Sequence, residues 1–180
     1  KLTDKVNFTY SMHGLFVFRN NTIDSSIGET ALTSKSYNLD SFSLQLNIKE
    51  IKTQEESRNI ENVVLLESEG DKRTKLEIVD NKLKFSVGDL SVTSVQDLPT
   101  TNVSIILVRE RNTMIKIYIN GEISSSMYNA ELADDIYTLN GLSLKRAPVV
   151  YDKIFTSNYG FTYNETADIS PEDDDDDDDD

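Results

Sequence analysis

Alternation of apolar and polar residues is the feature that most constrains how this chain folds. Between Phe42 and Ile48 every second residue is apolar, and Ser, Gln and Asn stand between them. Successive side chains of a strand point to opposite faces, so the pattern predicts a strand with one buried and one solvated face. Almost nothing repeats at the helical period. The sequence therefore predicts an all-β chain.

Turn residues divide the alternating segments into hairpins. Asp80-Asn81 stands between two alternating segments, which predicts a two-residue loop. A second hairpin is predicted from Val103 to Ile119, and its first strand is apolar enough to be central in a sheet. Asn120-Gly121 ends this hairpin, because both residues tolerate the positive φ that a type I′ turn requires.

Further strand candidates lie near both ends of the chain, in GLFVF, GLSLKR and KIFTSNYGF. Turn signals recur at intervals of about 8 to 12 residues, which is typical of sandwiches and jelly rolls. We expect an antiparallel β-sandwich or jelly roll with about 10 to 12 strands and little helix. The one candidate for a short helix covers residues 130–135.

Negative charge is concentrated at the C-terminal end. The 180 residues carry a formal net charge of −14, of which Glu172 and Asp173–Asp180 contribute −9, leaving −5 for the rest. A run of like charges repels itself, so we expect one domain over residues 1–165 and a disordered acidic tail over 166–180. A spacer, a diffuse binder of divalent cations and a segment repelled by anionic surfaces stay open as roles for the tail.

Composition also bears on partners and location. The acidic balance argues against nucleic acid and against direct binding to anionic membranes. Neither an apolar segment of about 18 residues nor an N-terminal apolar signal region is present, so the chain is either cytosolic or has lost a signal. The absence of cysteine excludes disulfides and thiolate chemistry. Four N-glycosylation sequons favour the secretory pathway lumen, the cell surface or the extracellular space, and they begin at Asn7, Asn20, Asn102 and Asn164.

Four segments follow one another in an informative order. NVVLLESEG at 62–70 is followed by the KLEIVDNKLKFSVGD hairpin, then by TNVSIILVRERNTMIKIYINGE and finally by YTLNGLSLKR. Over residues 41–145 this order resembles a laminin G-like domain of the concanavalin A-like lectin class, with Thr101-Asn102 where that family has Trp-His. The resemblance implies a β-sandwich.

Candidate catalytic residues are few. Glycoside hydrolases of this sandwich class use carboxylates at E-x-D-x-x-E spacing, and the nearest set here is Glu67, Glu69 and Asp71. Gly70 and Asp71 have the character of turn residues, which favours a solvated loop over a catalytic pair. His13, the sole histidine, has no thiol or evident hydroxyl partner from which to build a triad. We therefore expect no catalytic residues and no enzyme.

Binding residues are not identified by the sequence. No cofactor is expected, although calcium would suit loop carboxylates of this fold, for which the candidates are Asp89, Asp97, Asp134 and Asp135. Aromatic side chains that could stack on a sugar are Tyr128, Tyr137, Tyr151 and Tyr159. Our hypothesis is a non-enzymatic recognition or adhesion module that binds protein or glycan through edge loops or the concave sheet and is part of a larger membrane-anchored protein. A structural or assembly domain and a hydrolase with an unusual active site are the alternatives.

Overall fold

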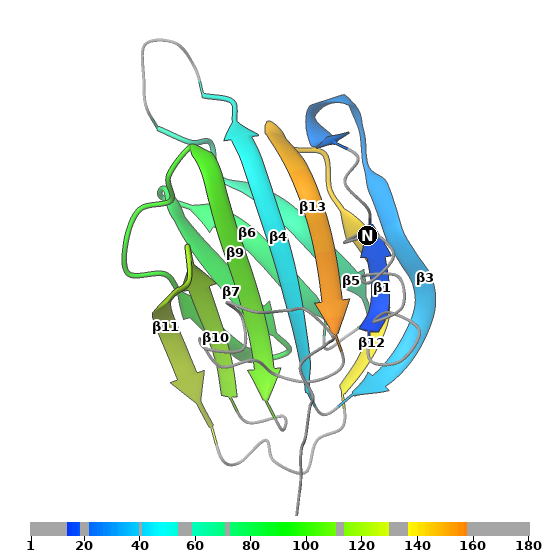
Figure 1. Ribbon diagram of the computed structural model, residues 1–180. Helices are drawn as coiled ribbons and strands as arrows, with labels where there is room; N and C mark the ends of the chain where they lie inside the picture. Colours follow the sequence, from blue (N-terminus) through cyan, green and yellow to red (C-terminus); the bar gives the residue numbers. More distant parts are fainter. Residues whose placement is uncertain are drawn as a thin grey trace, which may run out of the picture.

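Two antiparallel sheets packed face to face form the structure, a computed structural model that describes residues 14–18, 22–39, 41–53, 59–70, 73–110, 114–129 and 137–157 (Figure 1). In these residues the elements are β1 (Gly14–Phe18), β2 (Ile23–Asp24), the 3-10 turn η1 (Ser25–Ile27), β3 (Thr30–Leu39), β4 (Phe42–Ile51), β5 (Val63–Glu69), β6 (Thr74–Val79), β7 (Lys82–Val87), β8 (Leu90–Thr93), β9 (Thr101–Glu110), β10 (Met114–Ile119), β11 (Glu122–Tyr128), β12 (Tyr137–Leu144) and β13 (Val149–Ser157).

The order of strands defines two layers. Sheet A runs β1-β13-β4-β9-β10-β11, with β2 paired to β13, and lies in front in Figure 1. Sheet B runs β3-β12-β5-β6-β7-β8 and lies behind it. The predicted all-β antiparallel sandwich is confirmed, with slightly more strands among the described residues than expected. No helix among these residues is long and apolar enough to cross a membrane.

Alternation builds the core between the sheets. In β4, the side chains of Phe42, Leu44 and Ile48 are at most 2% exposed, and in sheet B Leu76 and Phe85 are fully buried. Burying a side chain of this size contributes about 1.5–3 kcal/mol relative to leaving it in water. The predicted central strand is confirmed as well, since β9 lies between β4 and β10.

Both predicted tight turns are present. Asp80 and Asn81 have φ values of 52° and 68°, and Asn120 and Gly121 have φ values of 52° and 86°. Two consecutive positive φ values are what a type I′ hairpin turn requires. Asn81 also anchors the chain before β5, because its Oδ1 accepts a hydrogen bond from the backbone N of Ile60 at 2.8 Å.

One strand was not expected from the sequence. Asn120-Gly121 was predicted only to end a hairpin, but it leads directly into β11, which pairs with β10 from Glu122 to Tyr128 with one irregularity. The helix candidate at 130–135 lies outside the described residues, as do the predicted domain limit at residue 165 and the acidic tail at 166–180.

Candidate functional site

Several sequence candidates cannot be placed. Outside the described residues lie His13, Asp71, Asp134, Asp135, Tyr159, and the sequon residues Asn7, Asn20 and Asn164. Tyr137 begins β12, but its side chain is not described. The remaining candidates lie on separate parts of the sandwich.

Glu67 and Glu69 lie at the end of β5, in sheet B. Glu67 accepts a hydrogen bond from Nη1 of Arg73 at 2.7 Å, and that arginine is about half exposed. Glu69 is exposed and lies opposite Asn140 of β12. A carboxylate neutralised by a solvated guanidinium is an ordinary surface ion pair. The arrangement therefore gives no support to a catalytic pair.

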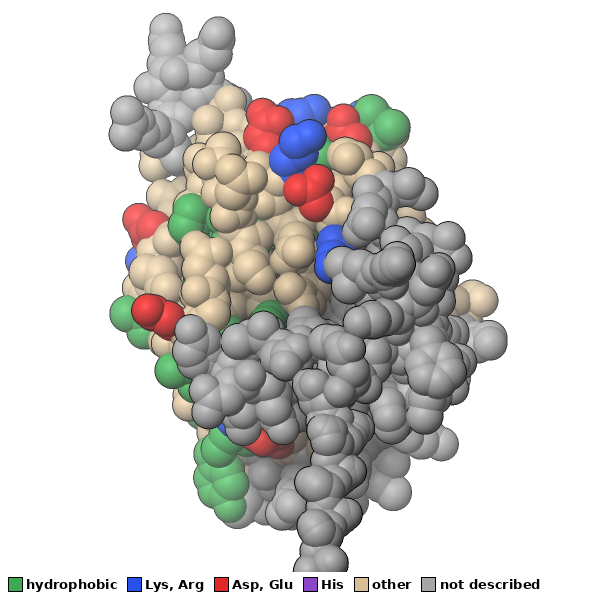
Figure 2. Space-filling view, viewed as in Figure 1, with side chains coloured by type: hydrophobic (Ala, Val, Ile, Leu, Met, Phe, Trp, Pro, Cys, Tyr) green, Lys and Arg blue, Asp and Glu red, His purple; other side chains and the backbone are tan. Residues whose placement is uncertain are grey.

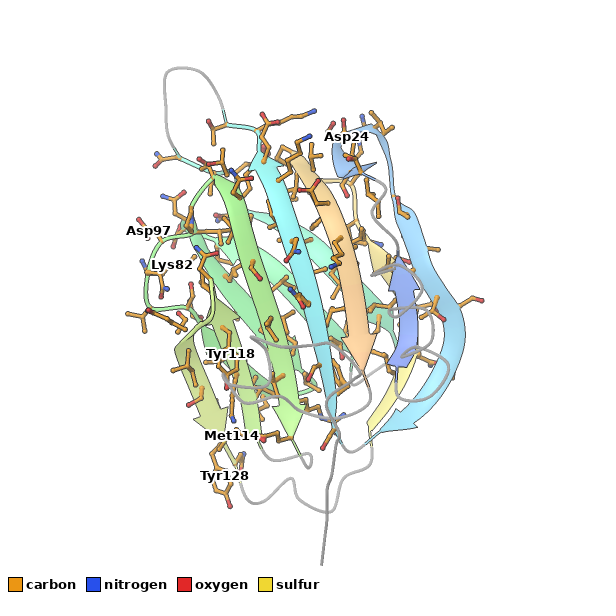
Figure 3. All side chains as sticks on the ribbon, viewed as in Figure 1. Asp24, Lys82, Asp97, Met114, Tyr118 and Tyr128 are labelled. Carbon is orange, nitrogen blue, oxygen red and sulfur yellow. The ribbon has the colours of Figure 1, made fainter. Side chains whose placement is uncertain are left out.

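The calcium candidates within the described residues do not form a cage. Asp97 accepts a hydrogen bond from Nζ of Lys82 at 2.7 Å, and the two side chains lie together in Figure 3. Asp89 is exposed in the turn between β7 and β8. No group of three or more His, Cys, Asp or Glu side chains that could hold a metal ion exists among the described residues.

Tyr151, a sequence candidate for sugar stacking, is a core residue instead. It is 0% exposed, because the alternation that buries Val149 continues to it along β13. Burial raises the pKa of the Tyr151 hydroxyl far above its ordinary value of 10.0. That side chain cannot reach a ligand. Tyr128 does remain available, since it is 61% exposed at the end of β11.

The outer face of sheet A carries uncharged hydrogen-bonding side chains on its central strands. We call Gln45, Asn47, Ser104 and Asn120 the amide face. Gln45 Nε2 donates to Asn47 Oδ1 at 3.3 Å, and Asn47 lies directly opposite Ser104 on β9. Asn120 Oδ1 accepts from the backbone N of Ser104 at 2.9 Å. Figure 2 shows that uncharged atoms dominate the middle of this face, while charged side chains gather at its upper end.

The lower part of the same face is apolar and closed. Ile106, Val108 and Tyr118 point outward by their register with β4 and β10, yet they are 3%, 0% and 4% exposed. Of these three residues and the four of the amide face, only those of the amide face are accessible to solvent.

Charged side chains surround η1 at the upper end of the sandwich. Asp24 caps the turn, accepting hydrogen bonds from the Ser26 backbone N at 3.0 Å and the Ser26 hydroxyl at 2.6 Å. These bonds, with a smaller contribution from Lys52, lower the pKa of Asp24 below its ordinary value of 3.8. Lys52 Nζ donates to Asp24 Oδ2 at 3.4 Å, and Arg146 Nε donates to the Ser26 carbonyl at 3.3 Å. Ile27, the last residue of η1, is 81% exposed.

The β11 edge of sheet A carries three of the five large apolar side chains that are exposed in the described part of the chain. We define this edge as the strand β11, whose side chains Ile123, Met127 and Tyr128 are 54%, 42% and 61% exposed. Tyr128 lies directly across from Met114, and both are seen at the lower end of the hairpin in Figure 3. The only sign of this edge in the sequence is the absence of lysine and proline from EISSSMY.

Asn102 is the one sequon residue within the described part of the chain. It is exposed at the start of β9, with a φ of 51°, and the next residue, Val103, is 1% exposed in the core. Its side chain thus lies at the surface of a well-anchored strand.

Comparisons with known proteins identify solved structures with a similar fold. No family model and no curated protein match the chain, so the laminin G-like resemblance has no family match behind it. Solved structures of botulinum neurotoxin domains do match. The binding domain of botulinum neurotoxin DC in complex with rat synaptotagmin II has a TM-score of 0.63 and 10% identity over 89% of this chain and 50% of that one.

Two further structures match in the same way. The receptor binding domain of botulinum neurotoxin type G has a TM-score of 0.59 and 15% identity over 85% of this chain and 49% of that one. The binding domain of botulinum neurotoxin DC in complex with SialylT has a TM-score of 0.59 and 13% identity over 71% and 34%. The chain thus spans between about a third and a half of these proteins. At such identities the likeness shows the fold alone, a β-sandwich that these binding domains share.

Proposed function

We propose that the chain is a non-enzymatic recognition module whose amide face binds a glycan. The observation that carries the proposal is the set of amide and hydroxyl groups that β4, β9 and the β10–β11 turn hold on one outer face of sheet A. A side-chain amide has both donors and an acceptor, as a sugar hydroxyl does, so the two can pair without burying a charge.

Rigidity supports the same proposal. The Gln45 and Asn47 side chains extend from β4, which pairs on both sides, with β13 and β9. Asn120 is fixed by its hydrogen bond from Ser104. Groups that are ordered before a ligand arrives cost less entropy to bind, so a site on central strands suits a polar ligand that forms few apolar contacts.

The comparisons support a binding role in a general way. The similar solved structures are named as binding domains, one in complex with SialylT and one with a protein, synaptotagmin II. The laminin G-like order of segments points to the same broad class of modules. A protein ligand at this face is the other outcome of the test below.

A glycan array followed by calorimetry on the hits tests the proposal. Asn47→Ala and Gln45→Ala are each expected to weaken binding about tenfold, because each removes hydrogen bonds to the ligand. Thr93→Ala, which changes an exposed hydroxyl on the outer face of sheet B, is the matched control and should bind as the wild type does. No binding to any neutral or acidic glycan on the array, or equal binding by all variants, would overturn the proposal.

A hydrolase remains the enzymatic alternative, and a polysaccharide panel tests it. Turnover that disappears in Glu67→Gln combined with Glu69→Gln would replace the binding role by catalysis. The ion pair between Glu67 and Arg73 leads us to expect no turnover.

A location in the secretory pathway is part of the proposal, and Asn102 gives it a test. The residue is exposed, as an acceptor of N-linked glycan must be in the folded protein. Secretion from a eukaryotic host should give a product whose electrophoretic mobility changes on glycosidase treatment. Asn102→Gln should remove one step of that change, and a product that never carries glycan at this residue would contradict the assignment.

A further inference from the structure

The β11 edge combines two properties that favour association. It is the last strand of sheet A in the described part of the chain, so one side of its backbone has no strand partner there. It also carries three of the five large apolar side chains that are exposed among the described residues. Natural edge strands are commonly protected by lysine, by proline or by shortness, and β11 has seven residues with neither of those side chains.

The register shows which backbone groups face outward. Asn120 N donates to the Ser104 carbonyl at 2.8 Å, so even-numbered residues of β10 direct their backbone groups toward β9 and odd-numbered residues toward β11. Ile117 and Ile115 lie opposite Ser125 and Met127. The backbone groups of Ser125 and Met127 are therefore used by β10, and those of Ser126 and Tyr128 point away from the sheet.

Only the lower part of this edge is regular. The pairing of β10 with β11 shifts between Ile117 and Tyr118, which leaves a bulge at Ser124. Ser124 is also held by the chain that follows β8, because its Oγ accepts a hydrogen bond from the Val95 backbone N at 3.0 Å. A bulge interrupts strand addition, so the segment open to strand addition is Ser126 to Tyr128.

We infer that this segment pairs antiparallel with the same segment of a second copy, joining two A sheets edge to edge. Ser126 of each copy lies opposite Tyr128 of the other and exchanges two backbone hydrogen bonds with it. The two Met127 side chains meet on the two-fold axis, in the closely spaced, non-hydrogen-bonded position. The pairing covers Met127 and Tyr128, which are 42% and 61% exposed in the single chain.

A second copy fits this segment because the segment is self-complementary. No charged side chain lies between Ser125 and Asn129, so the symmetric pairing brings no like charges together. Glu122, the one charge in β11, lies beyond the bulge. Both copies use the same surface, so the contact forms a closed dimer and does not continue into a fibre.

Proline substitution at the edge gives a sharp test. Ser126→Pro removes an N–H that faces away from β10, so the single chain keeps its ladder while the dimer loses two hydrogen bonds. Ser126→Ala removes only the hydroxyl and is the matched control. By sedimentation equilibrium we expect a dimer for the wild type and Ser126→Ala, and a dissociation constant about tenfold higher or more for Ser126→Pro.

Cross-linking tests the register independently of the proline variant. The chain has no cysteine, so Met127→Cys introduces a single thiol at the axis, where the close approach suits a disulfide. Met127→Cys should form a covalent dimer under mild oxidation, and Ile123→Cys, exposed but above the bulge, should not. A monomer at every concentration, a dimer unaffected by Ser126→Pro, or faster cross-linking through Ile123→Cys would each overturn the inference.

Discussion

Asn120 and Ser104 hold each other through two hydrogen bonds across the β9–β10 pair. The Asn120 backbone N donates to the Ser104 carbonyl at 2.8 Å, and Asn120 Oδ1 accepts from the Ser104 backbone N at 2.9 Å. Asn120 also has a φ of 52° at the first position of the turn into β11. One side chain thus fixes the turn, the pairing of β9 with β10 and one corner of the amide face.

Replacing Asn120 should show how much its side chain contributes to stability. Asn120→Ala loses the side-chain acceptor, and alanine tolerates positive φ less well than asparagine does, so we expect a loss of about 1–3 kcal/mol in the free energy of unfolding. Asn120→Asp keeps an acceptor oxygen and tolerates the same φ, and should lose little. Urea unfolding of the three proteins measures both. Equal losses in the two variants would mean that the acceptor contributes nothing.

Tyr151→Phe should leave the protein as stable at neutral pH or make it more stable by about 1 kcal/mol. The Tyr151 hydroxyl is fully buried and has no hydrogen-bond partner in the described part of the chain, so removing it costs no bond. Urea unfolding at pH 7 measures the change. A marked loss of stability there would show that the hydroxyl is bonded after all.

Alkaline pH should act on the same residue. Burial raises the folded-state pKa of Tyr151 above its ordinary value of 10.0. Ionisation of Tyr151 therefore leaves the free energy of unfolding unchanged below pH 10 and lowers it as the pH rises further. The loss amounts to at most about 1.4 kcal/mol per pH unit. Tyr151→Phe should show a weaker alkaline loss of stability than the wild type, and Tyr128→Phe, changed at an exposed side chain, should behave as the wild type does.

The fold was predictable where alternation is strict. Between Phe42 and Ile48 the apolar face of the strand has to be buried, and a second sheet is needed to cover that face. The positive φ at Asn120-Gly121 followed from residue type alone. β11 was missed because EISSSMY alternates poorly: on an edge strand both faces are partly solvated, so no hydrophobic period records its register.

The candidate site was less predictable, for a physical reason. Gln45, Asn47 and Ser104 look like the ordinary solvated half of two alternating strands, and only the pairing of β4 with β9 brings them onto one face. For Tyr151 the prediction failed in the opposite way, because a proposed surface residue lies in the core. A tyrosine near a strand end is compatible with the surface and with the core, and only the continuation of alternation from Val149 decides between them.

Asp24 should titrate below its ordinary value. Hydrogen bonds from Ser26 stabilise the carboxylate, and Lys52 adds a smaller effect, so the pKa of Asp24 is lowered from 3.8. The stabilisation of η1 is therefore present above pH 3.8 and is lost as the pH falls through the lowered pKa. Carboxyl chemical shifts followed by NMR should give a midpoint below 3.8, and Ser26→Ala should move it back up. A midpoint at or above 3.8 would mean that the cap does not form in solution.

Ser124→Ala should loosen the connection between the sheets at the β11 edge. Ser124 Oγ accepts a hydrogen bond from the Val95 backbone N at 3.0 Å and donates to Gln96 Oε1 at 2.6 Å. Both partners are exposed, so water replaces the lost bonds and we expect only about 0.5–1 kcal/mol of lost stability. The sharper readout is local, because the Val95 amide should exchange its hydrogen faster. Ser126→Ala, which changes a neighbouring exposed hydroxyl, should leave that exchange rate as it is. If Ser124→Ala also left it unchanged, the hydrogen bond from the Val95 backbone N to Ser124 would not exist in solution.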